Sequence, residues 1–220
     1  MKQIAIYGAG GFGKEVACIL NLINEKVPTW EFLGFFDDGK EKGSQISHFG
    51  PVLGNLHDLN NWPLPLNIAF AVGSPAILQK LTNSITNPNI AFPNIIHPEA
   101  YFAHKQSFTI GKGNVIVRGC SFSCDVTIGN FNLFNSISAL AHDVKVGDYN
   151  VFMPLTRISG ETTIGNQNFF GIGSVVLQCI TIGNNTRIGA GSFVMRNTQD
   201  GCLYMGNPTK KVDGFANMGN

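Results

Sequence analysis

The sequence has little charge and lacks any hydrophobic run long enough to cross a membrane. Charged residues make up 13% of its 220 residues, roughly half the usual share. No apolar stretch approaches the roughly 18 residues of a membrane-spanning helix, and no signal-peptide pattern opens the chain. Lysine and arginine form no cluster and the formal net charge is +1, so neither a nucleic acid nor an anionic membrane is favoured as a partner. We therefore expect a cytoplasmic protein.

Cysteine is sparse, whereas glycine is abundant. The five cysteines include no CxxC pair, which predicts free thiols in a reducing compartment and no metal site. The 26 glycines and the 44% of apolar residues exclude disorder for most of the chain and are typical of tight turns and large buried faces.

The first 95 residues combine strand and helix patterns with a glycine-rich turn. Apolar strand patterns and helical spacing alternate over residues 4–7, 14–24, 32–36, 68–72 and 76–81, which predicts a Rossmann-like α/β domain over residues 1–95 with a parallel sheet of three or four strands. The motif Gly8-x-Gly10-x-x-Gly13 separates the first strand from the first helix, where backbone N–H groups can bind phosphate. The simpler alternative is a tight turn without a ligand. The domain is too small for an NAD-dependent dehydrogenase.

Residues 96–220 are predicted to form a second domain, and residues 110–194 within it follow a strict period of six. Every sixth residue from Ile110 to Val194 is apolar, and Thr-Ile-Gly or Lys-Val-Gly recurs every 18 residues. Neither a helix nor a coiled coil has this period, so we predict a three-sided parallel β-helix of about five coils with the sixth residues inside. The glycine after many inward residues is expected to adopt a turn conformation that a Cβ would resist. Asn114, Asn132, Asn150 and Asn168 are expected to stack as an amide ladder.

Five segments resemble one known family. Hexad repeats of this kind resemble the left-handed β-helix acyltransferases, and nearly the whole chain resembles the sialic-acid O-acetyltransferase/PglD-like family. The resemblance implies a homotrimer that transfers an acetyl group from acetyl-CoA to the amino group of a nucleotide-linked amino sugar. A 4-amino-4,6-dideoxyhexose for bacterial surface glycans such as lipopolysaccharide O-antigen is the expected acceptor. The matching segments are Gly8–Glu15, Phe36–Asp38, Ala141–Asp143, Ile188–Gly191 and Gly206–Lys210.

The resemblance also implies roles for individual residues. His142 would be the general base at an outward corner of the β-helix, with Asp143 orienting it. Gly160 follows His142 by one 18-residue period and would present its N–H to the acetyl carbonyl, or it is a turn glycine chosen for positive φ. The predicted acetyl-CoA-binding residues are Gly160, Gly171, Gly173, Gly189, Ala190, Pro208 and Lys210. The predicted nucleotide-sugar-binding residues are Gly8, Gly10, Gly11, Phe12, Gly13, Asp37, Asp38 and Gly73.

The sequence departs from the family at two positions, and two alternatives remain open. Phe12 stands where the family often has histidine, and Val151 stands where some relatives have a second one. O-acetylation of sialic acid or another glycan hydroxyl would need no nucleotide, and a purely structural module would tolerate loss of His142. A γ-type carbonic anhydrase shares the β-helix but is excluded, because it needs three histidine ligands and the coils contain one histidine.

Overall fold

The computed structural model describes residues 1–212, so residues 213–220 of the predicted C-terminal tail lie outside the described residues. The chain divides into two compact units. One comprises Met1–Pro98 with Lys112–Val115, and the other comprises Glu99–Gly111 with the chain from Ile116 onward. No helix among residues 1–212 is both long and apolar enough to span a membrane.

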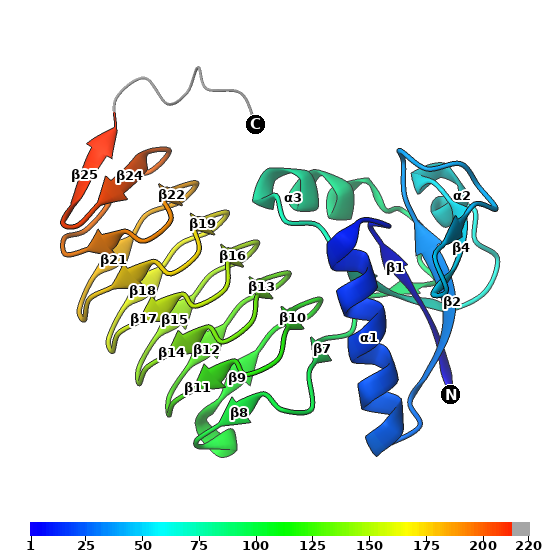
Figure 1. The fold of residues 1–220 in the computed structure, drawn as a ribbon, viewed down its shortest axis with the longest axis horizontal. Coiled ribbons are helices and arrows are strands. Elements are labelled where there is room, and N and C mark those ends of the chain that lie inside the picture. The colour runs from blue at the N-terminus through cyan, green and yellow to red at the C-terminus, as the bar shows by residue number, and fades with distance from the viewer. Residues whose placement is uncertain (213–220) are drawn as a thin grey trace. The chain divides into compact units, whose positions relative to one another are not determined.

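The first unit contains a six-stranded sheet and three helices (Figure 1). The strand order is β3-β4-β2-β1-β5-β6, with β3 antiparallel to β4. The prediction of three or four strands is therefore wrong, and it missed β3, β4 and β6. Strands β3 and β6 have two residues each, and β4 contains two glycines and a proline, which are depleted in strands. The elements are β1 (Lys2–Tyr7), α1 (Gly11–Lys26), β2 (Trp30–Phe36), β3 (Gln45–Ile46), β4 (Gly50–Gly54), α2 (Leu56–Asn60), β5 (Leu66–Phe70), α3 (Pro75–Ser84), β6 (Ile90–Ala91) and β7 (Ile95–Ile96).

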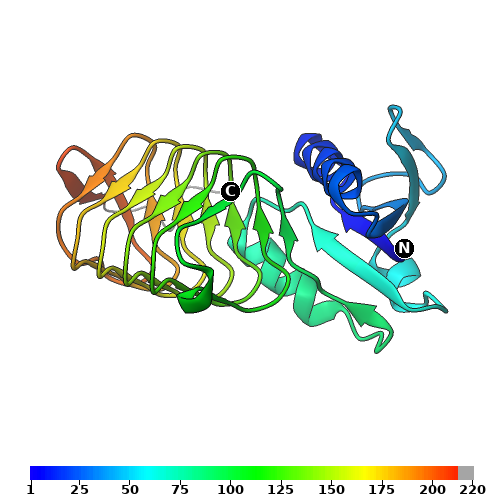
Figure 2. The same cartoon turned by 90° about the horizontal axis from the view of Figure 1, so that it is seen from below.

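The second unit is a left-handed β-helix built largely of two-residue strands, whose successive coils lie side by side along the horizontal in Figure 2. One face contains β9 (Thr109–Ile110), β12 (Thr127–Ile128), β15 (Lys145–Val146), β18 (Thr163–Ile164) and β21 (Thr181–Ile182). Another contains β8 (Tyr101–Phe102), β11 (Ser121–Phe122), β14 (Ala139–Leu140), β17 (Arg157–Ile158), β20 (Val175–Val176) and β23 (Phe193–Val194). The third contains β10 (Val115–Ile116), β13 (Leu133–Phe134), β16 (Val151–Phe152), β19 (Phe169–Phe170), β22 (Arg187–Ile188) and the antiparallel hairpin of β24 (Leu203–Gly206) and β25 (Thr209–Val212). A short 3-10 helix spans Lys105–Ser107.

The six-residue period places its apolar residues inside the coils, as predicted. All of them except Ile110 in the first coil are buried. The rings of Phe134, Phe152 and Phe170 stack with centroids 4.6 Å apart, close to the spacing of neighbouring strands. Register and core packing therefore have the same repeat.

The glycines that directly follow inward residues were predicted to adopt a special turn conformation, and this prediction is wrong. Every sixth residue from Gly113 to Gly191 has a positive φ, three positions after each inward residue. The glycines that directly follow inward residues do not. A Cβ on Gly147 would lie 2.7 Å from the carbonyl oxygen of Gly165 in the next coil. These glycines are needed because adjacent coils approach closely, and not because of their backbone angles.

Two side-chain ladders hold the corner after the first face. The predicted asparagine ladder is confirmed in Asn150, whose Nδ2 donates to Asn132 Oδ1 at 3.0 Å and whose Oδ1 accepts from the N–H of Asn168 at 2.9 Å. A second ladder was not predicted. Its side chains accept backbone N–H groups of the preceding coil at 2.7–2.9 Å, and it runs through Asn130, Asp148, Asn166, Asn184 and Asp200.

Candidate active site

His142 and Asp143 form a hydrogen-bonded pair at the corner between β14 and β15. The imidazole Nδ1 lies 2.8 Å from Asp143 Oδ2, and the two side chains are 53% and 55% exposed. Neighbouring side chains diverge on a regular strand, whereas Asp143 has a φ of +60° and its carboxylate turns back to the ring. A neutral imidazole that donates Nδ1–H to this carboxylate keeps Nε2 as a proton acceptor.

Gly160 lies against the imidazole ring of His142. A Cβ at this position would be 2.5 Å from Cε1 and 2.6 Å from Nε2 of the ring. Gly160 is not among the residues with positive φ, so the alternative explanation as a turn glycine is wrong. The N–H of the following residue, Glu161, donates to the His142 carbonyl at 3.0 Å. Within residues 1–212 the Gly160 N–H has no hydrogen-bond acceptor, which leaves a donor beside the ring.

The other predicted acetyl-CoA residues lie elsewhere on the β-helix. Gly171, Gly173, Gly189 and Ala190 occupy the corner between the faces of β19 and β20, which is a different corner from that of His142. A single chain therefore does not bring them to the imidazole. Pro208 and Lys210 line a cleft of about 320 Å³ together with Met195, Arg196 and Thr209. Arg196 was not predicted as a site residue. It lies three 18-residue periods after His142 and so belongs to the same corner.

The glycine-rich turn of the first unit divides into two pairs. Gly8 has a φ of +111°, and its Cβ would lie 2.6 Å from the Ala71 carbonyl oxygen, while a Cβ on Gly13 would collide with the Gly8 carbonyl. These two glycines pack the turn. Gly10 and Gly11 have open space where a Cβ would be, and no side chain caps the N-terminus of α1. A phosphate can therefore approach the first N–H groups of this helix.

Asp37 and Asp38 follow β2, and both accept hydrogen bonds from neighbouring segments; Asp37 alone bonds to the glycine-rich turn. Asp37 accepts the N–H of Ala9 at 2.7 Å and that of Gly39 at 2.9 Å. Asp38 accepts the Tyr7 hydroxyl at 2.7 Å and the N–H of Leu56 at 2.9 Å. Burial and the hydrogen bond to Asp38 raise the pKa of Tyr7 well above its ordinary value, so this hydroxyl stays a donor. Each carboxylate oxygen keeps a second lone pair for a ligand.

A cleft of about 390 Å³ opens beside these carboxylates. It lies at the carboxyl ends of β1 and β2, where ligands bind in open α/β sheets. Gly8, Asp37 and Asp38 are the predicted residues that line it, whereas Gly10, Gly11, Phe12, Gly13 and Gly73 do not. The residues of α3 that line this cleft were not predicted. They are spaced three and four apart and therefore share one face of the helix. The full lining is Tyr7, Gly8, Asp37, Asp38, Gly39, Leu56, Val72, Ile77, Lys80, Leu81 and Ser84.

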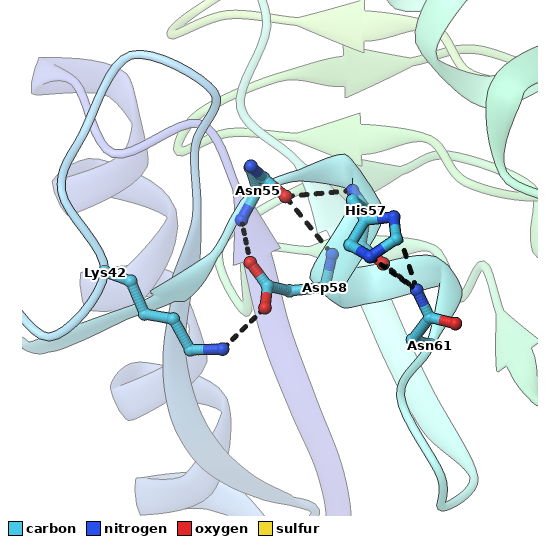
Figure 3. A network of polar contacts seen from close by, with 5 residues as sticks. All are labelled: Lys42, Asn55, His57, Asp58 and Asn61. Carbon is cyan, nitrogen blue, oxygen red and sulfur yellow. Dashed lines mark hydrogen bonds and ion pairs between the residues drawn. The ribbon is translucent and has the colours of Figure 1, made fainter.

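A second cleft of the first unit is lined in part by a network of polar side chains, which Figure 3 shows. The hydrogen bonds of this network stabilise the start of α2. Asn55 Oδ1 accepts from the N–H groups of His57 and Asp58 at the start of α2, and Asp58 accepts the N–H of Asn55 in return. The Lys42 ammonium lies 2.5 Å from Asp58, and this hydrogen bond lowers the pKa of the Asp58 carboxyl. These four side chains bond to one another or to nearby backbone, whereas the buried Nε1 of Trp62, which lines the same cleft, has no hydrogen-bond partner within residues 1–212.

Comparisons with known proteins match both units. Residues 3–85 match the PglD N-terminal domain model, and residues 161–196 match the bacterial transferase hexapeptide model. The acetyltransferase domain of PglB from Neisseria gonorrhoeae FA1090 is 27% identical with a TM-score of 0.87, over 96% of this chain and 100% of that one. PerB from Caulobacter crescentus, in complex with CoA and GDP-perosamine, is 26% identical with a TM-score of 0.84 over 96% and 98%. WeeI from Acinetobacter baumannii AYE is 25% identical with a TM-score of 0.83 over 96% and 100%. No curated protein sequence matches.

The β-helix contains the match to the bacterial transferase hexapeptide model, and the first unit contains the match to the PglD N-terminal domain model. The predicted resemblance to the PglD-like acetyltransferases is confirmed. Among residues 1–212 no group of three or more His, Cys, Asp or Glu side chains is placed to hold a metal ion.

Proposed function

We propose that this chain transfers the acetyl group of acetyl-CoA to the amino group of a nucleotide-linked amino sugar. The observation that carries the proposal is the hydrogen-bonded pair of His142 and Asp143 beside the unused N–H of Gly160. Relatives that match over nearly the whole chain support it, since one was solved with acetyl coenzyme A and another with CoA and GDP-perosamine.

Two groups of the protein at this corner carry the chemistry, namely the N–H of Gly160 and Nε2 of His142. The amine nitrogen attacks the thioester carbonyl carbon, and the carbonyl π electrons move to oxygen, where the Gly160 N–H stabilises the charge. His142 Nε2 takes the proton that the nitrogen must lose. The C–S bond then breaks, and the leaving thiolate of CoA receives this proton from the imidazolium, so the enzyme returns to its starting state.

The cleft beside Asp37 and Asp38 is proposed to bind the nucleotide. The open N-terminus of α1 suits the diphosphate, and Lys80 supplies a cation at the cleft. The free lone pairs of Asp37 and Asp38 suit N–H or hydroxyl donors of the nucleoside. Because each carboxylate already accepts two hydrogen bonds from the protein, direct contact with the nucleoside stays a prediction.

Acetyl-CoA is proposed to lie along the corner that carries His142. Gln178 and Arg196 follow Gly160 at intervals of 18 residues, so each lies one coil, about 4.8 Å, further along the β-helix. The cleft of Arg196, Pro208 and Lys210 lies at the end of this row and suits the phosphates of CoA. The predicted Gly171, Gly173, Gly189 and Ala190 would contact the same molecule only from a second copy of the chain.

A homotrimer in the bacterial cytoplasm, serving surface-glycan synthesis, remains part of the proposal. Its support is an exposed apolar surface at the corner that bears Gly171. Ile137, Leu155 and Ile172 are 50%, 45% and 51% exposed there, and burial against another subunit would remove this surface from water.

Acetyl transfer can be tested by thiol release from acetyl-CoA with UDP-, dTDP- and GDP-linked 4-amino sugars. We expect turnover with one of them and little with the same sugar lacking its nucleotide, because binding of the nucleotide positions the amine. Free sialic acid serves as the comparison acceptor. Turnover with sialic acid alone would favour O-acetylation, and no thiol release with any acceptor would contradict an acetyltransferase.

Replacing Arg196 by alanine tests the proposed CoA site. We expect the KM for acetyl-CoA to rise about 10- to 100-fold, as for the loss of a hydrogen bond between charged groups, with kcat nearly unchanged. Arg118→Ala is the matched control, because its exposed side chain pairs only with Glu99 among the described ion pairs. Equal KM values for Arg196→Ala and the unmodified chain would place the CoA phosphates elsewhere.

A further inference from the structure

The acidic side chains at left-handed corner positions are confined to one corner of the β-helix. The residues with positive φ between Gly113 and Gly191 recur at all three corners. At the other two corners they are glycine, aromatic, aliphatic or amide residues. At the corner of His142 they are Asp125, Asp143 and Glu161, followed by Cys179.

Glu161 has the same backbone conformation as Asp143, one coil further on. Their φ values are +57° and +60°, so the two side chains leave the β-helix in the same direction. Like charges on neighbouring strands destabilise a sheet. No salt bridge compensates Glu161 within residues 1–212, and its side chain is exposed. The fold alone therefore gives no reason for a carboxylate at this position.

The imidazole of His142 connects Glu161 to the reaction. The ring extends from its own coil towards the next one, since Nε2 would lie 2.6 Å from a Cβ on Gly160. Glu161 directly follows Gly160 in that coil and donates its N–H to the carbonyl of His142. Asp143 is bound to Nδ1 on the other side of the ring, whereas the longer Glu161 side chain has no such bond. The Glu161 side chain therefore starts from the backbone position next to the glycine that faces Nε2, and we infer that its carboxylate can reach an acceptor nitrogen bound there.

We propose that Glu161 is the acceptor-binding residue that makes this site select a cationic amine over a hydroxyl. This inference rests on the acetyl transfer proposed above. An amino sugar arrives largely as an ammonium ion, which a carboxylate attracts, and it loses one proton to solvent before its nitrogen can attack. When the free amine attacks the thioester carbon, its nitrogen becomes positively charged until His142 removes the proton. A hydroxyl acceptor brings no charge to the site, so Glu161 stabilises only the bound amine and its transition state.

The test is Glu161→Gln, assayed for thiol release with the accepted nucleotide-linked amine. We expect kcat/KM for the amine to fall about 10- to 100-fold, as for a lost bond between charged groups, while the KM for acetyl-CoA stays within about twofold. In the unmodified chain the KM for the amine should rise with salt because ions screen the attraction. This salt dependence should weaken in Glu161→Gln, which a merely structural role would not cause.

Asp125→Asn is the matched control. It removes the same charge from the same corner, but two coils before Glu161 and away from Gly160, so turnover should change less than about twofold. An equal loss in both variants, or none in Glu161→Gln, would overturn the role of Glu161 while leaving acetyl transfer intact. Failure of the unmodified chain to acetylate any amine would overturn both proposals.

Discussion

Replacing His142 by alanine is expected to lower kcat for acetyl transfer by about 10²- to 10⁴-fold, the usual contribution of a positioned general base. The imidazole is 53% exposed and its Nδ1 is held by Asp143, so truncation removes the proton acceptor and leaves no buried cavity. Stopped assays of thiol release, together with calorimetric binding of acetyl-CoA, measure the two effects separately. The thermal midpoint and acetyl-CoA affinity should remain close to those of the unmodified chain.

A second variant, Asp143→Asn, accompanies His142→Ala. Asp143→Asn keeps a side chain of the same size but loses the negative charge that holds the Nδ1–H tautomer. Its kcat should fall between those of the unmodified chain and His142→Ala. Turnover within about threefold of normal in His142→Ala would contradict the base and support a purely structural β-helix.

Replacing Gly160 by alanine is expected to lower kcat about 100-fold, the scale of loss that follows a misplacement of about 1 Å at an active site. The added Cβ would lie 2.5–2.6 Å from two atoms of the His142 ring, so the ring must move. The Gly160 N–H is retained, and Gly160 does not have a positive φ, so alanine is compatible with the backbone. The measurement is kcat together with the thermal midpoint, which should change little.

A double-mutant cycle separates the steric effect from other causes. If Gly160 acts through the ring, Gly160→Ala should cost almost nothing further in a chain that already carries His142→Ala. Gly147→Ala is the contrasting variant, because its Cβ would meet the carbonyl of Gly165 in the next coil. That substitution should lower stability and leave kcat nearly unchanged. Additive losses in the double variant would show that Gly160 does not act through His142.

Periodicity explains why so much of the second unit could be predicted. A residue and its partner 18 positions later stack in adjacent coils, so spacing alone placed Gly160 next to His142 and predicted the ladder through Asn150. The first unit has no such repeat. There β3, β4 and β6 were missed, because two residues contain too little pattern to identify a strand and because the glycines and proline of β4 are not typical of one.

The sequence by itself determined the two-part architecture, the inward residues of the coils and the glycine-rich turn, because each depends on periodicity or on adjacent residues. The hydrogen bond between His142 and Asp143 was decided by the structure, because it needs the positive φ of Asp143. Only the tertiary structure decided that Asp37 supports the turn through Ala9 and that Lys80 joins the same cleft. It also decided that Gly160 is needed to accommodate a ring. These contacts depend on the direction of side chains and on which distant segments meet. The spacing of residues along the chain determines neither of them.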